Sequence, residues 1–200
     1  MRGLFINNSM NFIKKNCNYE QSKLEEIKYG LEAIYILITK TIIILSVAFI
    51  LGLLKEVVIF TLSYSLIRLF SFGLHATKSW ICLVTSLIIF LIMPLFCKNV
   101  ELNIFIKALI SIVNIIFIYK NAPADTHKRP IVNKKRREKY KFLSTIVAIL
   151  MSLTAFFINN SFLSNCLIMS IVVQNFMISP TIYKLFKLPY DNYKKYLNEV

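Results

Sequence analysis

The chain has 200 residues, of which 56% are hydrophobic and 14% aromatic, with four glycines and a mean hydropathy of +0.61. This composition leaves too little polar surface to cover a soluble globule of that size, so it excludes an ordinary soluble domain and predicts an integral membrane protein. The formal net charge of +14 would suit a nucleic-acid-binding protein, but the charges fall in patches between apolar runs, which argues against that class.

Cysteine spacing gives no sign of a metal centre or a disulfide framework. The four cysteines include no CxxC pair, and both histidines are far from any second thiol. Neither a metal nor another cofactor is therefore expected. Several membrane spans would leave no room for a separate soluble module, so residues 1–200 are expected to form one membrane domain.

Residues 1–30 form a charged segment before the first apolar run. Leu24, Ile27 and Leu31 recur at helical spacing among lysines and glutamates. This spacing predicts an amphipathic helix on the cytoplasmic surface of the membrane or against a partner helix. The alternative is a solvated lead-in to the first span. A cleavable signal peptide is not expected, because the polar stretch is too long for its n-region.

Six apolar runs follow this segment, within residues 33–182. They cover residues 33–54, 57–72, 80–97, 102–119, 142–158 and 162–182. A helix needs about 20 residues to cross about 30 Å of hydrocarbon, so the second and fifth runs are short. The prediction is an all-α integral membrane protein with about six transmembrane helices. A four-span chain with re-entrant segments is the alternative.

The basic residues alternate between the connections of these runs. Of the 24 Lys and Arg residues, five lie in the N-terminal segment, two at 68–80, nine at 120–141 and four in the tail 183–200. The connections near Lys55 and Lys98 hold one each. By the positive-inside rule, both termini, the break at 68–82 and the loop at 120–141 are cytoplasmic. The break and the loop can then meet.

The break between the second and third runs carries reactive residue types. In a continuous helix, His75 and Cys82 would be about 10 Å apart, too far for proton transfer. A catalytic pair therefore requires a turn, for which Gly73 supplies backbone freedom. With Ser79 as the N-cap of the third span, Cys82 takes the third helical position, where free amides stabilise a thiolate. Alternatively, the cysteine is a small hydrophobe and the histidine an interfacial anchor.

The loop at 120–141 is restricted by Pro123 and Pro130 and is strongly basic in its second half. The basic residues can hold an acidic peptide or anchor anionic lipid, and their charge alone does not separate the two uses. They are Lys128, Arg129, Lys134, Lys135, Arg136 and Arg137. No aromatic residues interleave with them as in a nucleic-acid-binding surface, so no nucleic acid is expected. His127 is a possible second base or an exposed loop histidine.

These residues together resemble a known family. The sequence Arg68-x-x-x-x-Gly73-x-His75-Ala, a cysteine seven residues after the histidine, and Ala122-Pro-Ala-Asp-Thr followed by Lys-Arg-Pro and a basic cluster resemble the accessory gene regulator protein B family. Its members are membrane cysteine endopeptidases of bacterial quorum sensing. One departure stands out: the family usually has two glycines before the histidine, and Phe72 occupies the first position here.

The resemblance implies that Cys82 and His75 are the catalytic pair, in a homodimer in the bacterial cytoplasmic membrane with its active site on the cytoplasmic side. Its substrate would be a small propeptide with an amphipathic leader and an acidic tail. The enzyme would remove the tail and keep the remainder as a thioester, which an internal cysteine or serine attacks to form a thiolactone or lactone.

Two further residues have alternative roles in such a mechanism. Arg68 would help an oxyanion hole or serve as a positive-inside anchor. Asp125 would orient His75 as a third catalytic member or cap its own loop turn.

The rival hypothesis is a non-catalytic carrier or peptide-export component, with Lys40, Gln174 and Asn175 lining a path. For Gln174 and Asn175, interhelical hydrogen bonds are favoured over substrate contact.

Overall fold

The computed structural model describes residues 2–74, 79–126 and 130–197. Within these ranges the regular structure is helical, apart from one isolated bridge between Phe72 and Ala124. The predicted all-α class is confirmed. The chain divides into two compact units, residues 1–50 and 51–200.

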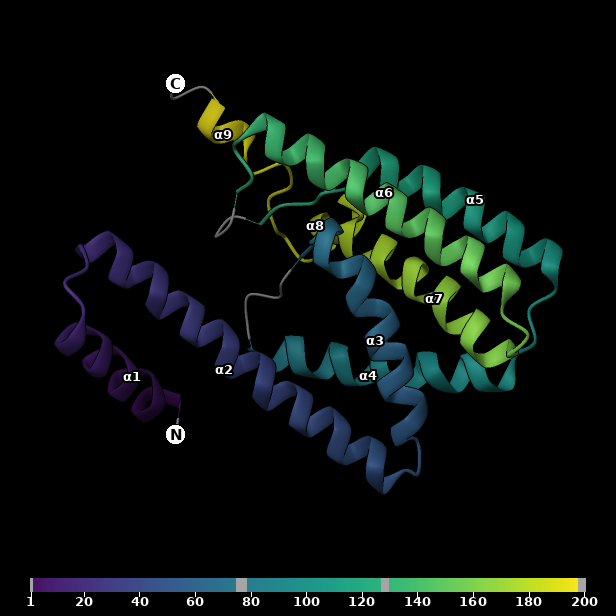
Figure 1. Ribbon diagram of the computed structural model, residues 1–200, viewed down its shortest axis with the longest axis horizontal. Helices are drawn as coiled ribbons and strands as arrows, with labels where there is room; N and C mark the ends of the chain where they lie inside the picture. Colours follow the sequence, from purple (N-terminus) through teal and green to yellow (C-terminus); the bar gives the residue numbers. More distant parts are fainter. Residues whose placement is uncertain (1, 75–78, 127–129, 198–200) are drawn as a thin grey trace. The chain divides into compact units, whose positions relative to one another are not determined.

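The first unit is a hairpin of two helices, α1 (Arg2–Asn16) and α2 (Gln21–Ile50). Arg2 Nη2 lies 2.7 Å from Glu32 Oε2, and the rings of Phe5 and Tyr35 are 5.6 Å apart. The helices are therefore antiparallel (Figure 1).

The predicted helix over residues 1–30 needs correction. The chain breaks at residues 17–20, and the apolar stripe from Leu24 belongs to α2, which continues without interruption into the first apolar run. The single Gly30 is tolerated within a long helix, so nothing ends α2 between the stripe and the run.

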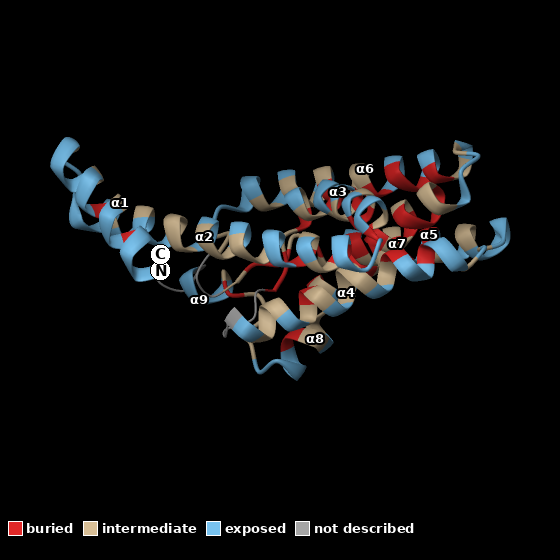
Figure 2. Cartoon of the chain, turned by 90° about the horizontal axis from the view of Figure 1, so that it is seen from below, coloured by how far each residue is buried: buried red, intermediate tan, exposed pale blue. Residues whose placement is uncertain are grey.

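The second unit is built around one central helix. Its members are α3 (Leu54–Ser71), α4 (Ser79–Asn99), α5 (Ile104–Asn121), α6 (Lys134–Phe157), α7 (Ser161–Ile178), α8 (Pro180–Leu185) and α9 (Lys194–Leu197). Helix α7 contacts α3, α4, α5 and α6. Buried residues gather along it, and Ile168, Ile171 and Ile178 are almost fully enclosed (Figure 2).

Successive long helices of this unit run in alternating directions (Figure 1). The ends of α3, α5 and α7 and the starts of α4 and α6 therefore lie toward the same end of this unit. There the chain at Ser71–Gly73 contacts Ala124, so the described parts of the break and of the basic loop meet, as the charge pattern predicts.

Five helices are long and apolar enough to cross a membrane among the described residues: α2, α4, α5, α6 and α7. Basic residues from Lys134 onward extend α6 to 24 residues, so the short fifth apolar run lies in a helix that is long enough to cross a membrane. Helix α3 has 18 residues but includes Lys55, Glu56 and Arg68, and it is not among the five. A multi-pass membrane protein is confirmed, and the six-span count stays a prediction that depends on α3.

Polar side chains inside the second unit join helices to one another. Asn175 Nδ2 donates to Asn114 Oδ1, linking α7 to α5, and Lys107 Nζ donates to Ser164 Oγ over 2.8 Å. Asn165 Nδ2 donates to the carbonyls of Cys97 at 3.2 Å and Val100 at 2.7 Å. Such bonds satisfy polar groups that lipid would penalise. The interhelical role predicted for Asn175 is confirmed.

We predict that Asn165→Ala destabilises the protein by about 1–2 kcal/mol, because it removes two bonds to carbonyls at the end of α4. Thermal unfolding in detergent measures the effect. The matched control is Asn99→Ala, which changes an exposed asparagine at the same helix end and should have little effect. If the two substitutions lower the stability equally, the Asn165 hydrogen bonds do not stabilise the contact between α4 and α7.

Candidate active site

The chain leaves α3 through a sharp, non-helical turn. Gly73 has φ +113°, and a Cβ atom there would lie 2.8 Å from both Arg68 Nη1 and the carbonyl oxygen of Met177. Only glycine fits such a position without displacing its neighbours. The backbone freedom predicted for Gly73 is confirmed.

Phe72 also has a positive φ, of 54°, with ψ −126°. An L-residue is strained at positive φ, and glycine is not. Two contacts hold the strained residue. Its ring packs edge-on against Tyr140 with centroids 4.8 Å apart, and Gln174 Nε2 donates to its carbonyl at 2.7 Å. The hydrogen bond predicted for Gln174 therefore secures the turn.

Backbone hydrogen bonds fix this turn to the loop after α5 and to the end of α7. Gly73 N donates to the carbonyl of Ala124 at 2.9 Å, and Ala124 N donates to the carbonyl of Ser71 at 3.1 Å. Leu74 N donates to the carbonyl of Met177 at 3.0 Å. The two polar segments that carry the sequence motif are thus in direct contact.

The guanidinium of Arg68 folds back beneath the turn. Its Nη2 donates to the carbonyls of Leu74 at 3.0 Å and Gly73 at 3.5 Å. Nη1 is buried without an acceptor among the described residues. A positive-inside anchor would extend toward water, whereas this arginine holds a spare donor inside the site.

Cys82 lies in the first turn of α4 and is half-buried. Because α4 begins at Ser79, Cys82 is its fourth residue, one position further than the predicted cap implies. The thiol lies within electrostatic range of Tyr64, which also interacts electrostatically with Arg68. The sequence analysis missed Tyr64, although its spacing four residues before Arg68 places both on one face of α3.

His75 lies outside the described residues, as do His127, Lys128 and Arg129. Its pairing with Cys82 therefore stays a prediction. The other thiols have different surroundings: Cys17 lies between α1 and α2, and Cys97 and Cys166 are buried in one cluster of the core.

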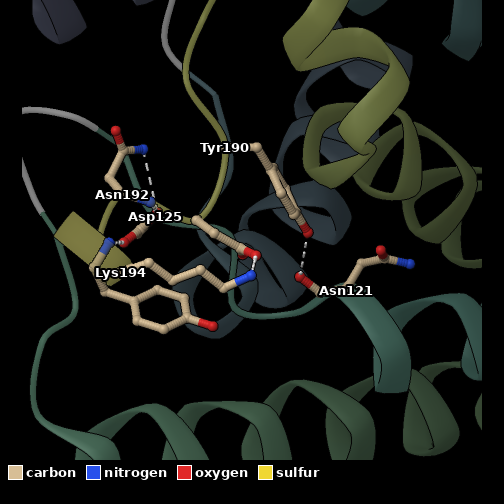
Figure 3. A network of polar contacts seen from close by, with 7 residues as sticks. Asn121, Asp125, Tyr190, Asn192 and Lys194 are labelled. Atoms are coloured by element: carbon tan, nitrogen blue, oxygen red, sulfur yellow. Dashed lines mark hydrogen bonds and ion pairs between the residues drawn. The ribbon is translucent and has the colours of Figure 1, made fainter. Parts of the chain in front are cut away.

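Asp125 is 5% exposed, and its carboxylate accepts from three main-chain donors and one side-chain donor. Oδ1 accepts from Asn192 N at 2.9 Å and from Asn192 Nδ2 at 3.3 Å (Figure 3). Oδ2 accepts from Tyr193 N at 2.9 Å and from Ile131 N at 3.4 Å. The predicted capping of its own loop is present through Ile131, but the main partners belong to the C-terminal tail.

Two tyrosines complete this network. Tyr183, which is 1% exposed, donates its hydroxyl to the carbonyl of Asp125 at 2.9 Å. Its ring lies 5.1 Å from that of Tyr190, whose hydroxyl donates to the carbonyl of Asn121 at 3.3 Å (Figure 3). Burial raises the pKa of Tyr190 to about 12, so its hydroxyl remains a donor at neutral pH. No local pattern in the sequence indicates these long-range partners.

The basic cluster occupies the first turn of α6. Asn133 caps the helix by accepting from Arg136 N at 3.1 Å. Positive side chains at this end oppose the helix dipole, so their concentration there requires another stabilising contact. Arg137 lies 3.6 Å above the ring of Tyr193, whereas Lys134 and Lys135 are exposed to solvent. The exposed lysines are the members best placed to attract an anion.

These features define a multi-pass helical membrane protein with a polar site at one end of its second unit. A family model described as Accessory gene regulator B matches residues 6–178. The chain belongs to the accessory gene regulator B family, which gives it a role in the accessory gene regulator quorum-sensing system.

Individual relatives agree with this assignment. The chain is 34% identical to an AgrB-like protein of Listeria innocua over 86% of this chain and 84% of the relative. It is 29% identical to an AgrB-like protein of Clostridium acetobutylicum, over 92% and 88% of the two chains. It is 32% identical to accessory gene regulator protein B of Staphylococcus aureus, over 74% and 75%. No solved structure matches the chain.

We predict that Phe72→Gly is more stable than Phe72→Ala by about 1 kcal/mol. Both substitutions remove the ring contact with Tyr140, but only alanine keeps the strain of a side chain at positive φ. Thermal unfolding in detergent separates them. Phe70, inside α3, gives the control pair, for which alanine should be the more stable. If the same substitution, glycine or alanine, is the more stable at both positions, the strain at Phe72 is contradicted.

Proposed function

We propose that this protein is a membrane cysteine endopeptidase that removes the C-terminal tail of a quorum-sensing propeptide. The observation that carries the proposal is the contact between the Ser71–Leu74 turn and the loop at Ala124. This contact unites both halves of the sequence motif, in a chain that belongs to the accessory gene regulator B family.

In the proposed reaction, the Cys82 thiolate attacks the carbonyl carbon at the junction between the future signal and its tail. His75 takes the thiol proton as general base and then gives it to the departing amine as general acid. The tail leaves with a new amino terminus, and the remainder stays bound to Cys82 as a thioester.

The thioester retains the energy needed for ring closure. An internal cysteine thiol or serine hydroxyl of the peptide attacks the thioester carbonyl, which releases Cys82 and forms a thiolactone or a lactone. Attack by water would yield an open acid instead, so a site that excludes water favours the ring.

Arg68 supports the acylation step in this scheme. Its buried Nη1 can donate to the carbonyl oxygen as negative charge develops there, together with amides at the start of α4. The bonds from Nη2 to Leu74 and Gly73 preorganise the guanidinium before the substrate arrives.

The substrate proposed here is a small propeptide of the AgrD type, with an amphipathic leader and an acidic tail. The cluster at Lys134 and Lys135 offers positive charge to that tail or to anionic lipid. The positive-inside pattern supports a site on the cytoplasmic side of the bacterial membrane. A homodimer is proposed from the family resemblance.

The carrier hypothesis has weaker support. Gln174 and Asn175 are committed to hydrogen bonds with Phe72 and Asn114, so their amides hold elements together rather than line a path.

We predict that Cys82→Ala abolishes removal of the propeptide tail in cells that express both proteins, because the proposed thioester forms on the Cys82 thiol and alanine has none. With the wild-type enzyme only, mass spectrometry should detect a released product or an enzyme adduct. In both, the peptide part should be lighter by one water than the hydrolysed fragment. Alanine substitutions of Cys17, Cys97 and Cys166 are the controls and should retain processing. Normal processing by Cys82→Ala would remove the proposal.

We predict that the double substitution Lys134→Gln and Lys135→Gln raises the KM for a propeptide with an acidic tail about threefold to tenfold, because exposed ion pairs contribute modestly. The difference from wild type should shrink as salt is raised, because salt screens the attraction.

A propeptide with a neutralised tail supplies the control, because the double substitution should not change its KM. Lys14→Gln with Lys15→Gln is the matched change in the first unit and should leave KM unaltered. If the acidic and neutral peptides respond alike, the cluster serves lipid binding or topology.

A further inference from the structure

Residues 188–196, called here the C-terminal clamp, lie against the loop that carries Asp125. We infer that this clamp holds the Ala122–Thr126 loop, and through it the active-site turn, in the geometry needed for acylation of Cys82. Asp125 is the positioning residue at its centre. The functional half of this inference rests on the proposed peptidase activity.

The first step is the capture of the clamp by Asp125. A buried carboxylate is stable only when donors replace the water it has lost. Three of its four donors come from the clamp: the backbone N–H groups of Asn192 and Tyr193, and the Asn192 side chain. Without the clamp, only Ile131 N remains, at 3.4 Å. The loop conformation and the docked tail therefore depend on each other.

Further contacts keep the clamp in register. Leu188 N donates to the carbonyl of Tyr183 at 2.9 Å, which ties the clamp to α8. Tyr190 reaches the carbonyl of Asn121 at the end of α5, as Figure 3 shows. Arg137 packs over the ring of Tyr193 and joins the clamp to α6. The clamp thus links elements on three sides of the loop.

The second step runs from the loop to the turn. The residue before Asp125 is Ala124, which exchanges hydrogen bonds with Ser71 and Gly73. Gly73 is two residues from His75 in the sequence. A displaced loop would move the backbone that leads into the proposed general base, and misplacement by about 1 Å can cost about a hundredfold in rate.

This role differs from membership of a catalytic triad. Both carboxylate oxygens of Asp125 already accept two hydrogen bonds each from the tail and Ile131. Asp125 therefore acts through the loop rather than as a direct partner of His75, and the clamp and Asp125 form one unit.

The test compares four forms of the purified protein: the wild type, Asp125→Asn, a chain that ends at Tyr190, and a chain that combines both changes. A chain that ends at Leu197 is the control, since it keeps every described donor to Asp125. Single-turnover acylation of Cys82 by the propeptide is measured in proteoliposomes across pH.

Asp125→Asn and the shortened chain should each slow acylation about tenfold to a hundredfold, with KM within about threefold of wild type. Their combination should be no slower than either alone, because both changes break the same unit. The pH dependence of the remaining activity should match that of wild type. The control chain should behave as wild type.

Two results would overturn the inference. One is full activity of the chain that ends at Tyr190. The other is a further tenfold loss when Asp125→Asn is added to that chain, with a shifted pH profile, which would assign Asp125 to direct interaction with His75.

A second readout needs no propeptide. Trypsin cleavage after Lys194 and Lys195 reports release of the clamp, and Asp125→Asn should accelerate it about tenfold, because charge-assisted hydrogen bonds are lost. The milder Asn192→Ala should accelerate it less. Unchanged cleavage in Asp125→Asn would refute the docking itself. If wild type processes no propeptide while cleavage responds as expected, the proposed peptidase function fails and the docked clamp stands.

Discussion

The main constraint on the end of the second unit that carries the candidate site is the need to satisfy the backbone of a buried, non-helical turn. Helices satisfy their own N–H and C=O groups, but residues 72–74 leave α3 and cannot. Arg68 of α3 supplies part of what they need, and their other partners are Ala124 after α5, Met177 at the end of α7 and the Gln174 side chain. Each bond fixes an element, so the turn determines how the ends of the helices are arranged.

The same turn contains two energetically unfavourable features that the surrounding residues offset. Phe72 is held at positive φ, and Arg68 keeps a buried donor without an acceptor among the described residues. Strain and unsatisfied donors at one place are typical of sites where function, rather than stability, selects the geometry. The ring of Tyr140 and the central position of α7 provide the rigid surroundings that such a turn needs.

A related conflict lies at the start of α6. Four consecutive basic residues face the positive end of the helix, yet the helix begins there, capped by Asn133. Stacking of Arg137 on Tyr193 offsets part of the repulsion, and the exposed lysines keep an electropositive surface beside the turn. An anionic partner would therefore stabilise this end of the protein as well as bind to it.

The sequence by itself determined the helical membrane class, the need for glycine at position 73 and the meeting of the two polar segments. These follow from signals that are local or additive: hydropathy, the conformational range of glycine and the count of basic residues in each connection. The interhelical bond of Asn175 was likewise predictable, because lipid penalises an unpaired amide. Such signals could not show that the apolar stripe from Leu24 belongs to the same helix as the first apolar run, or that α6 starts as early as Lys134.

Only the tertiary structure decided the partners of Asp125, the positive φ of Phe72 and the inward fold of Arg68. Asp125 accepts from the backbone N–H groups of Asn192 and Tyr193, which lie 67 and 68 positions further along the chain. Every residue except proline has such a group. A hydrogen bond from a backbone donor therefore does not require a particular amino acid at the donor position. For that physical reason, the contact that joins the tail to the Ala122–Thr126 loop is visible in the fold and absent from the sequence pattern.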